Sequence, residues 1–156
     1  MEIPPLSLEE IAEYLAKAHT SERHRAAKVL HQKGDYLNRV FNFVLADSYM
    51  QPHHHSEIEH IAIVEGKMAV VFFDDTGNMT HAVILEKPGE SVDVPSFAWH
   101  TYVAPSNYTV SYETMEGIYD PVTWKNFASW APAENGPKAS KYLMWLKEEA
   151  VRKIKD

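Results

Sequence analysis

The sequence contains no cysteine, which excludes disulfide bonds and thiolate catalysis and leaves nitrogen and oxygen atoms as donors for any metal ion. It also lacks a run approaching the roughly 18 apolar residues that a membrane-spanning helix needs. Basic residues are in the minority, with 15 Lys and Arg against 22 Asp and Glu, so a net charge of −7 argues against nucleic-acid binding. The amino terminus opens with acid and proline, unlike a signal peptide. We therefore expect a soluble cytoplasmic protein.

Helical patterns are confined to the two ends of the chain. The 156 residues, 45% of them apolar, suit one domain with a sizeable core. A capping-box pattern at Ser7–Glu10 and apolar residues at helical spacing predict a helix from about Ser7 to Ala18. The charged stretch Thr20–Lys33 is consistent with a second short helix. A last helix is predicted over about Lys138–Lys155, with one face formed by Tyr142, Trp145, Leu146 and Ile154.

The middle of the chain has the pattern of an all-β structure. From Tyr36 to Met115, runs rich in Val, Ile, Phe and Tyr alternate with turn clusters. No βαβ rhythm is present, so an antiparallel sandwich or barrel is favoured over a parallel sheet. The expected organisation is a single domain with three zones: a helical segment at 1–35, a β-barrel at 36–116, and an irregular segment with a helix at 117–156.

The residues with the clearest chemical meaning are histidines. On a strand, His53 and His55 project to one side and His54 to the other. A carboxylate at Glu59 and a distant histidine, His100, could complete the coordination of one divalent cation. The competing interpretation for each residue is a solvated or hydrogen-bonded polar patch. His54 and His60, on the opposite face, are interpreted as surface or interface residues.

Two segments resemble the signatures of the cupin superfamily. His53-x-His55-x3-Glu59-x6-Gly66 resembles the first signature, and Gly89-x5-Pro95-x4-His100 resembles the second. The resemblance implies a mainly β fold, a cupin-type antiparallel β-barrel (jelly roll), with His53, His55, Glu59 and His100 as metal ligands. Three positions depart from the superfamily pattern without removing a ligand: Asp47, Phe97 and Ala104, of which the first two replace glycines.

A narrower resemblance involves the WbuC-type cupin family. It rests on five stretches that lie between Leu8 and Leu146, namely Ser48–His53, Phe73–Gly77, Trp99–Thr101, Glu116–Pro121 and Phe127–Glu134. Members are associated with surface-polysaccharide assembly, which implies a sugar-related role by association only. Where that family is expected to carry an arginine, this chain has Gln51, so the resemblance does not imply an anionic substrate.

Further residues are candidates for contact with a bound ligand. Tyr49 and Gln51 share the inward parity of His53, and Tyr102 follows His100 by two positions, so all three are predicted substrate-binding residues, with core packing as the alternative. The Tyr119–Pro121 segment either closes the barrel mouth or forms a turn capped by its Asp, and the turn is favoured. No general base is assigned, although Glu113 and Glu116 lie beyond the signatures.

Three functions are compatible with these residues. The leading one is an enzyme that isomerises or epimerises a sugar or sugar-nucleotide derivative, with a divalent ion (Zn, Ni, Fe or Mn) holding substrate oxygens. The second is a non-catalytic sensor or binding module for a carbohydrate or small acid. The third, an iron-dependent dioxygenase, is less favoured because nothing in the sequence specifies iron. A homodimer is the expected assembly, with a monomer as the alternative, and the helical ends would either mask an exposed edge strand or swap across the dimer.

Overall fold

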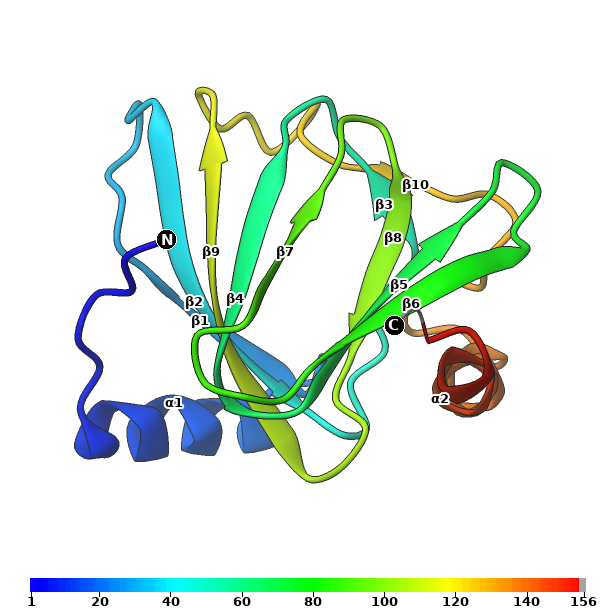
Figure 1. The fold of residues 1–156 in the computed structure, drawn as a ribbon, viewed down its shortest axis with the longest axis horizontal. Helices are drawn as coiled ribbons and strands as arrows, with labels where there is room; N and C mark the ends of the chain where they lie inside the picture. The colour runs from blue at the N-terminus through cyan, green and yellow to red at the C-terminus, as the bar shows by residue number, and fades with distance from the viewer. Residues whose placement is uncertain (155–156) are drawn as a thin grey trace.

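The computed structural model describes residues 1–154 and arranges them as two facing antiparallel sheets with a helix near each end of the chain (Figure 1). Sheet A has the order β1 (Arg25–Val29), β2 (Leu37–Leu45), β9 (Tyr108–Glu116), β4 (Glu59–Gly66) and β7 (Ser91–Val94). Sheet B has the order β10 (Asn126–Phe127), β3 (His53–His54), β8 (Trp99–Val103), β5 (Met68–Phe73) and β6 (Met79–Leu85). The predicted mainly β fold with terminal helices is confirmed.

Alternation along the strands builds the core between the two sheets. Ile61 and Ile63 of β4 face inward from sheet A, while Val70 and Phe72 of β5 face them from sheet B. All four are buried. Because side chains on a strand alternate between its faces, the other residues of the same strands form the outer faces, and one helix packs against part of each outer face.

Helix α1 (Leu8–Thr20) covers the outer face of sheet A. Its capping box is complete, because the Ser7 hydroxyl accepts from the Glu10 amide at 3.1 Å and the Glu10 side chain accepts from the Ser7 amide. Tyr14 stacks on Phe43 of β2 with ring centroids 5.0 Å apart. The helix starts at the predicted cap and extends two residues beyond the predicted end at Ala18.

Helix α2 (Ala139–Arg152) lies against the outer face of sheet B, beside β5 and β6 (Figure 1). Its buried face is formed by Ala139, Leu143, Leu146 and Ala150, so only Leu146 of the predicted face is fully buried. Ile154 follows the helix and bridges to Ala82 of β6. Lys155, the predicted last residue of this helix, lies outside the described residues.

The segment from Thr20 to Lys33 contains the strand β1 and no second helix, so the second short helix considered for it is wrong. Strand β1 pairs along its whole length with β2, from Arg25 opposite Val44 to Val29 opposite Val40. It lies at an edge of sheet A and is half-buried or exposed throughout, which gives its sequence no apolar alternation to indicate a strand.

Two turns near the motifs need positive backbone φ angles. Gly66 has φ +81°, and a Cβ added there would lie 2.4 Å from the Tyr108 carbonyl oxygen, so this hairpin requires glycine. Phe97, which replaces a motif glycine, keeps the left-handed conformation with φ +60°. The substitution therefore preserves the turn before β8. Within residues 1–154, no helix is long and apolar enough to cross a membrane.

Candidate metal centre

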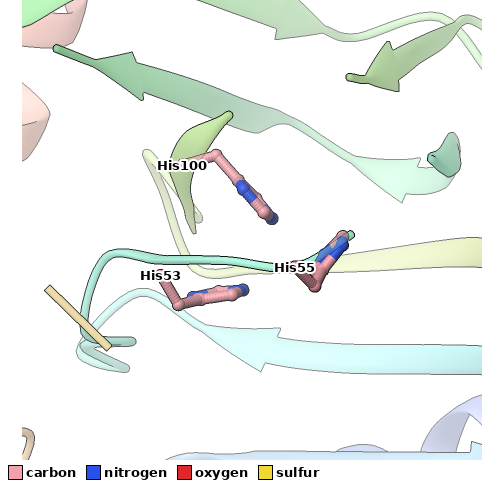
Figure 2. Close-up of side chains that lie close together, drawn as sticks. All are labelled: His53, His55 and His100. Carbon is pink, nitrogen blue, oxygen red and sulfur yellow. The ribbon is translucent and has the colours of Figure 1, made fainter. Parts of the chain in front are cut away.

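Three buried imidazoles converge at one end of the space between the sheets. His53, His55 and His100 each contribute one ring nitrogen to a group of three atoms that all lie within 4.8 Å of one another. Figure 2 shows the rings of the three side chains turned toward a common point. The described part of the chain thus brings together the three histidines that the two sequence motifs predicted.

The two motifs meet through backbone pairing. His53 on β3 lies opposite His100 on β8. The carbonyl of His55, just after β3, accepts a hydrogen bond of 2.7 Å from the amide of Phe97. The left-handed turn at Phe97 therefore joins the second motif to the first, and the histidine separation is set by the sheet.

Backbone carbonyls fix the orientation of all three rings. The Nδ1 atoms of His53, His55 and His100 lie 2.9, 2.8 and 2.8 Å from the carbonyl oxygens of Gln51, Glu57 and Ala98. A carbonyl can only accept, so each Nδ1 carries the proton and each Nε2 keeps its lone pair. Neutral imidazoles with free Nε2 atoms are the form that binds a metal ion.

Glu59 places a carboxylate beside two of these nitrogens. Its Oε2 atom lies 3.4 Å from Nε2 of His55 and 3.2 Å from Nε2 of His100. Glu59 starts β4, so its side chain points to the same inner face as Ile61. Burial opposes ionisation, but a hydrogen bond with Glu113 and the contacts with His100 and His55 hold the pKa of Glu59 well below its usual range.

The pKa values of His55 and His53 are shifted in opposite directions. Burial alone would lower the pKa of His55, yet the hydrogen bond and charge of Glu59 outweigh it and raise that pKa. Burial and the nearby His100 lower the pKa of His53 well below its ordinary value. In the metal-free protein, His55 is therefore the more readily protonated of these two rings.

Two further residues on the inner faces, Tyr102 and Glu113, are protonated and lie next to the ionised Glu59. The hydroxyl of Tyr102, on β8, donates a hydrogen bond to Oε2 of Glu59, and burial with the Glu59 charge raises the pKa of Tyr102 well above its ordinary value. Glu113, on β9, lies opposite Ile61 of β4 and so faces inward. Burial and the Glu59 charge raise the pKa of Glu113 well above the usual range, so Glu113 carries the proton of this carboxyl pair.

These residues line a cavity of about 200 Å³. Sheets A and B both contribute, and so does the segment between β9 and β10. The lining contains three of the four predicted ligands, His53, His55 and Glu59, with Tyr102, Glu113 and Met50. It also contains three basic side chains, Arg23, Arg25 and Lys125.

Two predicted ligand-contact residues use their polar groups elsewhere. The hydroxyl of Tyr49 donates to the carbonyl of Pro132 at 2.7 Å, and its ring packs in the core beneath α2. The amide of Gln51 donates to the carbonyl of Ala128 at 2.9 Å. Residues 48–52 are not strand, so the parity inferred from His53 does not extend to them, and Met50 takes the cavity-lining position instead.

The other histidines of the first motif point away from the cluster. His54 packs its ring on Trp99, with centroids 4.0 Å apart, and on Phe97. His60 lies on the outer side of β4, where its Nδ1 is 2.7 Å from the Asp93 carboxylate. At the Tyr119–Pro121 segment, the Asp120 carboxylate accepts from the amide of Val122 at 2.9 Å, which is the capped turn that was favoured.

The arrangement fits a divalent transition-metal ion. Nε2 of His100 is fully buried and, although Oε2 of Glu59 lies 3.2 Å away, it makes no hydrogen bond of good geometry among residues 1–154, whereas a buried polar nitrogen normally makes one. The neighbouring donors are imidazole nitrogen and carboxylate oxygen, which suit zinc, nickel, iron or manganese. A metal ion at the common point would satisfy this nitrogen and offset the cost of burying Glu59 among the histidines.

Two residues that line the cavity, Glu113 and Lys125, are not assigned a role by the sequence analysis. The register of β9 against β4 decides that Glu113 points inward, and no local pattern contains that information. Lys125 lies in the irregular segment between β9 and β10, where no periodicity assigns a face.

Comparison with known proteins gives a family and a fold. A family model described as "Domain of unknown function (DUF6016)" matches residues 6–85, just over half of the chain. This range includes three of the predicted ligands, His53, His55 and Glu59. No curated protein matched the sequence.

Solved structures of cupin fold resemble this one. The DMSP lyase DddQ from Ruegeria pomeroyi is similar with a TM-score of 0.55 and 19% identity, over 72% of this chain and 53% of that one. A salicylate 1,2-dioxygenase from Pseudoaminobacter salicylatoxidans, in complex with gentisate, gives 0.53 and 17%, over 71% and 33%. The polyketide cyclase RemF from Streptomyces resistomycificus gives 0.53 and 16%, over 84% of each chain. The chain spans about half of the lyase, and the predicted cupin fold is confirmed.

Proposed function

The chain belongs to the family described as "Domain of unknown function (DUF6016)", and we propose that it is a cupin metalloprotein with one divalent transition-metal ion at His53, His55, Glu59 and His100. The observation that carries this proposal is the convergence of three buried imidazoles whose Nδ1 atoms are all bonded to backbone carbonyls. Glu59, 3.2 Å from Nε2 of His100, supplies the fourth donor.

We further propose that the protein is an enzyme that isomerises or epimerises a sugar or sugar-nucleotide derivative. When bound, a divalent ion would polarise a substrate hydroxyl or carbonyl. The similarity to the WbuC-type family supports a role in surface-polysaccharide synthesis, and a cytoplasmic homodimer remains the expected form. The cavity, which is lined by residues of both sheets including His53, His55 and Glu113, supports a small-molecule substrate.

Glu113 is the residue we propose for proton transfer. Its carboxyl lines the cavity, retains a proton because it is buried beside the ionised Glu59, and lies on strand β9. Tyr102 is a weaker candidate, because its hydroxyl is committed to Glu59 and its raised pKa keeps it protonated. We propose instead that Tyr102 orients Glu59 and contacts substrate at the cavity wall. Contact of substrate with Tyr49 or Gln51 remains a prediction.

A metal-anchored sensor or binding module is the second candidate function. It is favoured by one observation: the polar groups that line the cavity beside the histidines are largely paired with one another, as Tyr102 with Glu59 and Glu113 with Glu59. A module of this kind would bind its ligand without turnover.

Exchange of carbon-bound substrate protons with solvent deuterium distinguishes the enzyme from the binding module. Metal-loaded protein is incubated in D2O with UDP-N-acetylglucosamine or GDP-mannose, and proton NMR follows the sugar C–H signals. An isomerase or epimerase that moves a carbon-bound proton washes deuterium into its substrate, and Glu113→Gln should slow this by about 100-fold while keeping the metal. A ligand that raises the melting temperature without deuterium incorporation would support the sensor and contradict the enzyme.

A further inference from the structure

We infer that this site binds an anionic ligand and that Lys125 contacts the anionic group of that ligand. This inference rests on the proposed metal site and deepens it by naming a substrate class. The chemistry recognised is a carboxylate or a phosphate on a small molecule, such as a sugar acid or the phosphate of a sugar derivative.

The charge around the cavity is the first observation. The chain as a whole has a net charge of −7, yet three basic side chains, Arg23, Arg25 and Lys125, line the cavity that also contains the metal-binding residues. The protein as a whole repels anions, but three cations gathered at one cavity attract them there.

The two arginines form a fixed part of this positive wall. Nη2 of Arg25 lies 2.8 Å from Oε1 of Glu134, and its Nη1 donates to the hydroxyl of Ser48 and the carbonyl of Tyr49. Nε of Arg23 lies 3.3 Å from the other oxygen of Glu134. The Arg25 side chain is only 9% exposed. Two guanidinium groups thus share one carboxylate and leave a surplus positive charge beside the cavity, with Arg25 buried and Arg23 55% exposed.

Lys125 differs from both arginines because its ammonium is not engaged. Among residues 1–154 it makes no hydrogen bond and no ion pair, although it lines the cavity and feels the charges of Glu113 and Glu59. It follows Trp124, whose buried ring anchors this part of the chain. Lys125 is therefore an exposed cation at the wall of the cavity, with its three donors available to a ligand.

The charge balance favours an anion over a neutral ligand. Even with Glu113 ionised, the three cations match the three carboxylates Glu59, Glu113 and Glu134. A divalent ion bound at the histidines then leaves an excess of positive charge. An anionic ligand that reaches Lys125 from the metal side neutralises this excess, whereas a neutral ligand leaves it unpaired.

The competing role for Lys125 is to neutralise Glu59 and Glu113 in the protein itself. The two roles separate in a binding experiment with simple anions. Acetate and methylphosphonate serve as probes for a carboxylate and a phosphate, and acetamide is the neutral analogue of acetate. Zinc-loaded protein of measured metal content is titrated with each probe at constant ionic strength, and the melting temperature and calorimetric binding are recorded.

The wild type should bind acetate or methylphosphonate but not acetamide, and the preferred anion identifies the group. Lys125→Met should raise the apparent Kd of that anion by about tenfold, since a charge-assisted hydrogen bond is lost, and Lys125→Arg should restore binding. Lys87→Met, at an exposed turn, is the matched control and should bind like the wild type. The melting temperature of each variant without probe reports its folding.

Two results would overturn the inference while leaving the metal site intact. One is a zinc-loaded wild type that responds to neither anion more than to acetamide. The other is a Lys125→Met protein that keeps wild-type affinity for the anion, which would assign Lys125 to neutralisation of the carboxyls. A wild type that holds no metal would overturn the proposed function and this inference together.

Discussion

The inner faces of the two sheets have a polar end and an apolar end. At the cavity end, Glu59 of β4 faces His100 of β8, and at the core end Ile61 and Ile63 of the same β4 face pack against Val70 of β5. The change occurs within two residues along one strand. The same strand geometry thus positions the candidate metal ligands and the core residues, and only side-chain chemistry distinguishes the two ends.

The two ends contribute differently to stability. Burial of Ile61 and its neighbours removes apolar surface from water, which stabilises the fold by roughly 25 cal/mol per Å². Burial of Glu59, His53 and His100 costs free energy that hydrogen bonds only partly offset. We therefore expect folding to depend mainly on the core end, and metal affinity to depend on the cavity end.

The largest effect is expected at the ligands. His55→Ala should lower metal affinity by more than about 100-fold, because it removes a ligand where loss of a supporting partner alone costs 10- to 100-fold. His54→Ala, one residue away, should leave metal content near wild type because His54 packs on Trp99 instead. Metal analysis of both variants after dialysis measures this. Equal losses in the two variants would show that the strand register is wrong by one residue.

The next largest effect is expected at the core end. Ile61→Ala should reduce the free energy of unfolding by about 2–5 kcal/mol, because it leaves a cavity in a fully buried position. Urea denaturation of the metal-free protein measures the loss. The folded variant should still bind one equivalent of metal. A variant that kept its stability but lost its metal would contradict the division between the two ends.

Metal binding at the cavity end should depend on pH, because it requires the histidines to be neutral. Because the pKa of His55 is raised above its ordinary value of about 6.5, protons already compete for this ring above that pH, while His53, with its lowered pKa, stays neutral. In the metal-free fold, protonated His55 beside Glu59 stabilises the protein below about pH 6.5, and this contribution is lost as pH rises through the raised pKa.

The difference in melting temperature between metal-loaded and metal-free protein should therefore shrink as the pH falls from about 7 to 5. Metal content should fall over the same range. A metal content unchanged at pH 5 would count against a centre built from histidines.

The smallest effect is expected at a residue shared by both ends. Tyr102 packs in the core cluster with Ile61 and donates to Glu59. Tyr102→Phe keeps the ring and removes the donor, so stability should change little and metal affinity should fall roughly tenfold. Competition with a chromophoric chelator measures the affinity. A large loss of stability with unchanged affinity would place the main role of the hydroxyl in folding.

The sequence predicted the parts of the site that are local. His53, His55 and Glu59 follow from spacing along one stretch, and His100 follows from a second stretch whose turn survives the replacement of glycine by Phe97. Likewise, the capping box at Ser7 predicted the start of α1 because a cap is a local contact.

Features that depend on distant segments were not predictable in this way. The inward orientation of Glu113 depends on the register of β9 against β4, and β1 is a strand because β2 offers it a partner. Tyr49 and Gln51 were placed by extending strand parity into a segment that is not strand. Alternation predicts facing only within an element, and the cavity lining is assembled between elements.

The most direct test of the metal centre is elemental analysis by plasma mass spectrometry of untagged wild-type protein beside His100→Ala. The convergence of His53, His55 and His100 predicts near one equivalent of a transition metal in the wild type and loss of that metal in the variant. A wild type that binds no metal even after titration with zinc, nickel, iron and manganese would contradict the central claim.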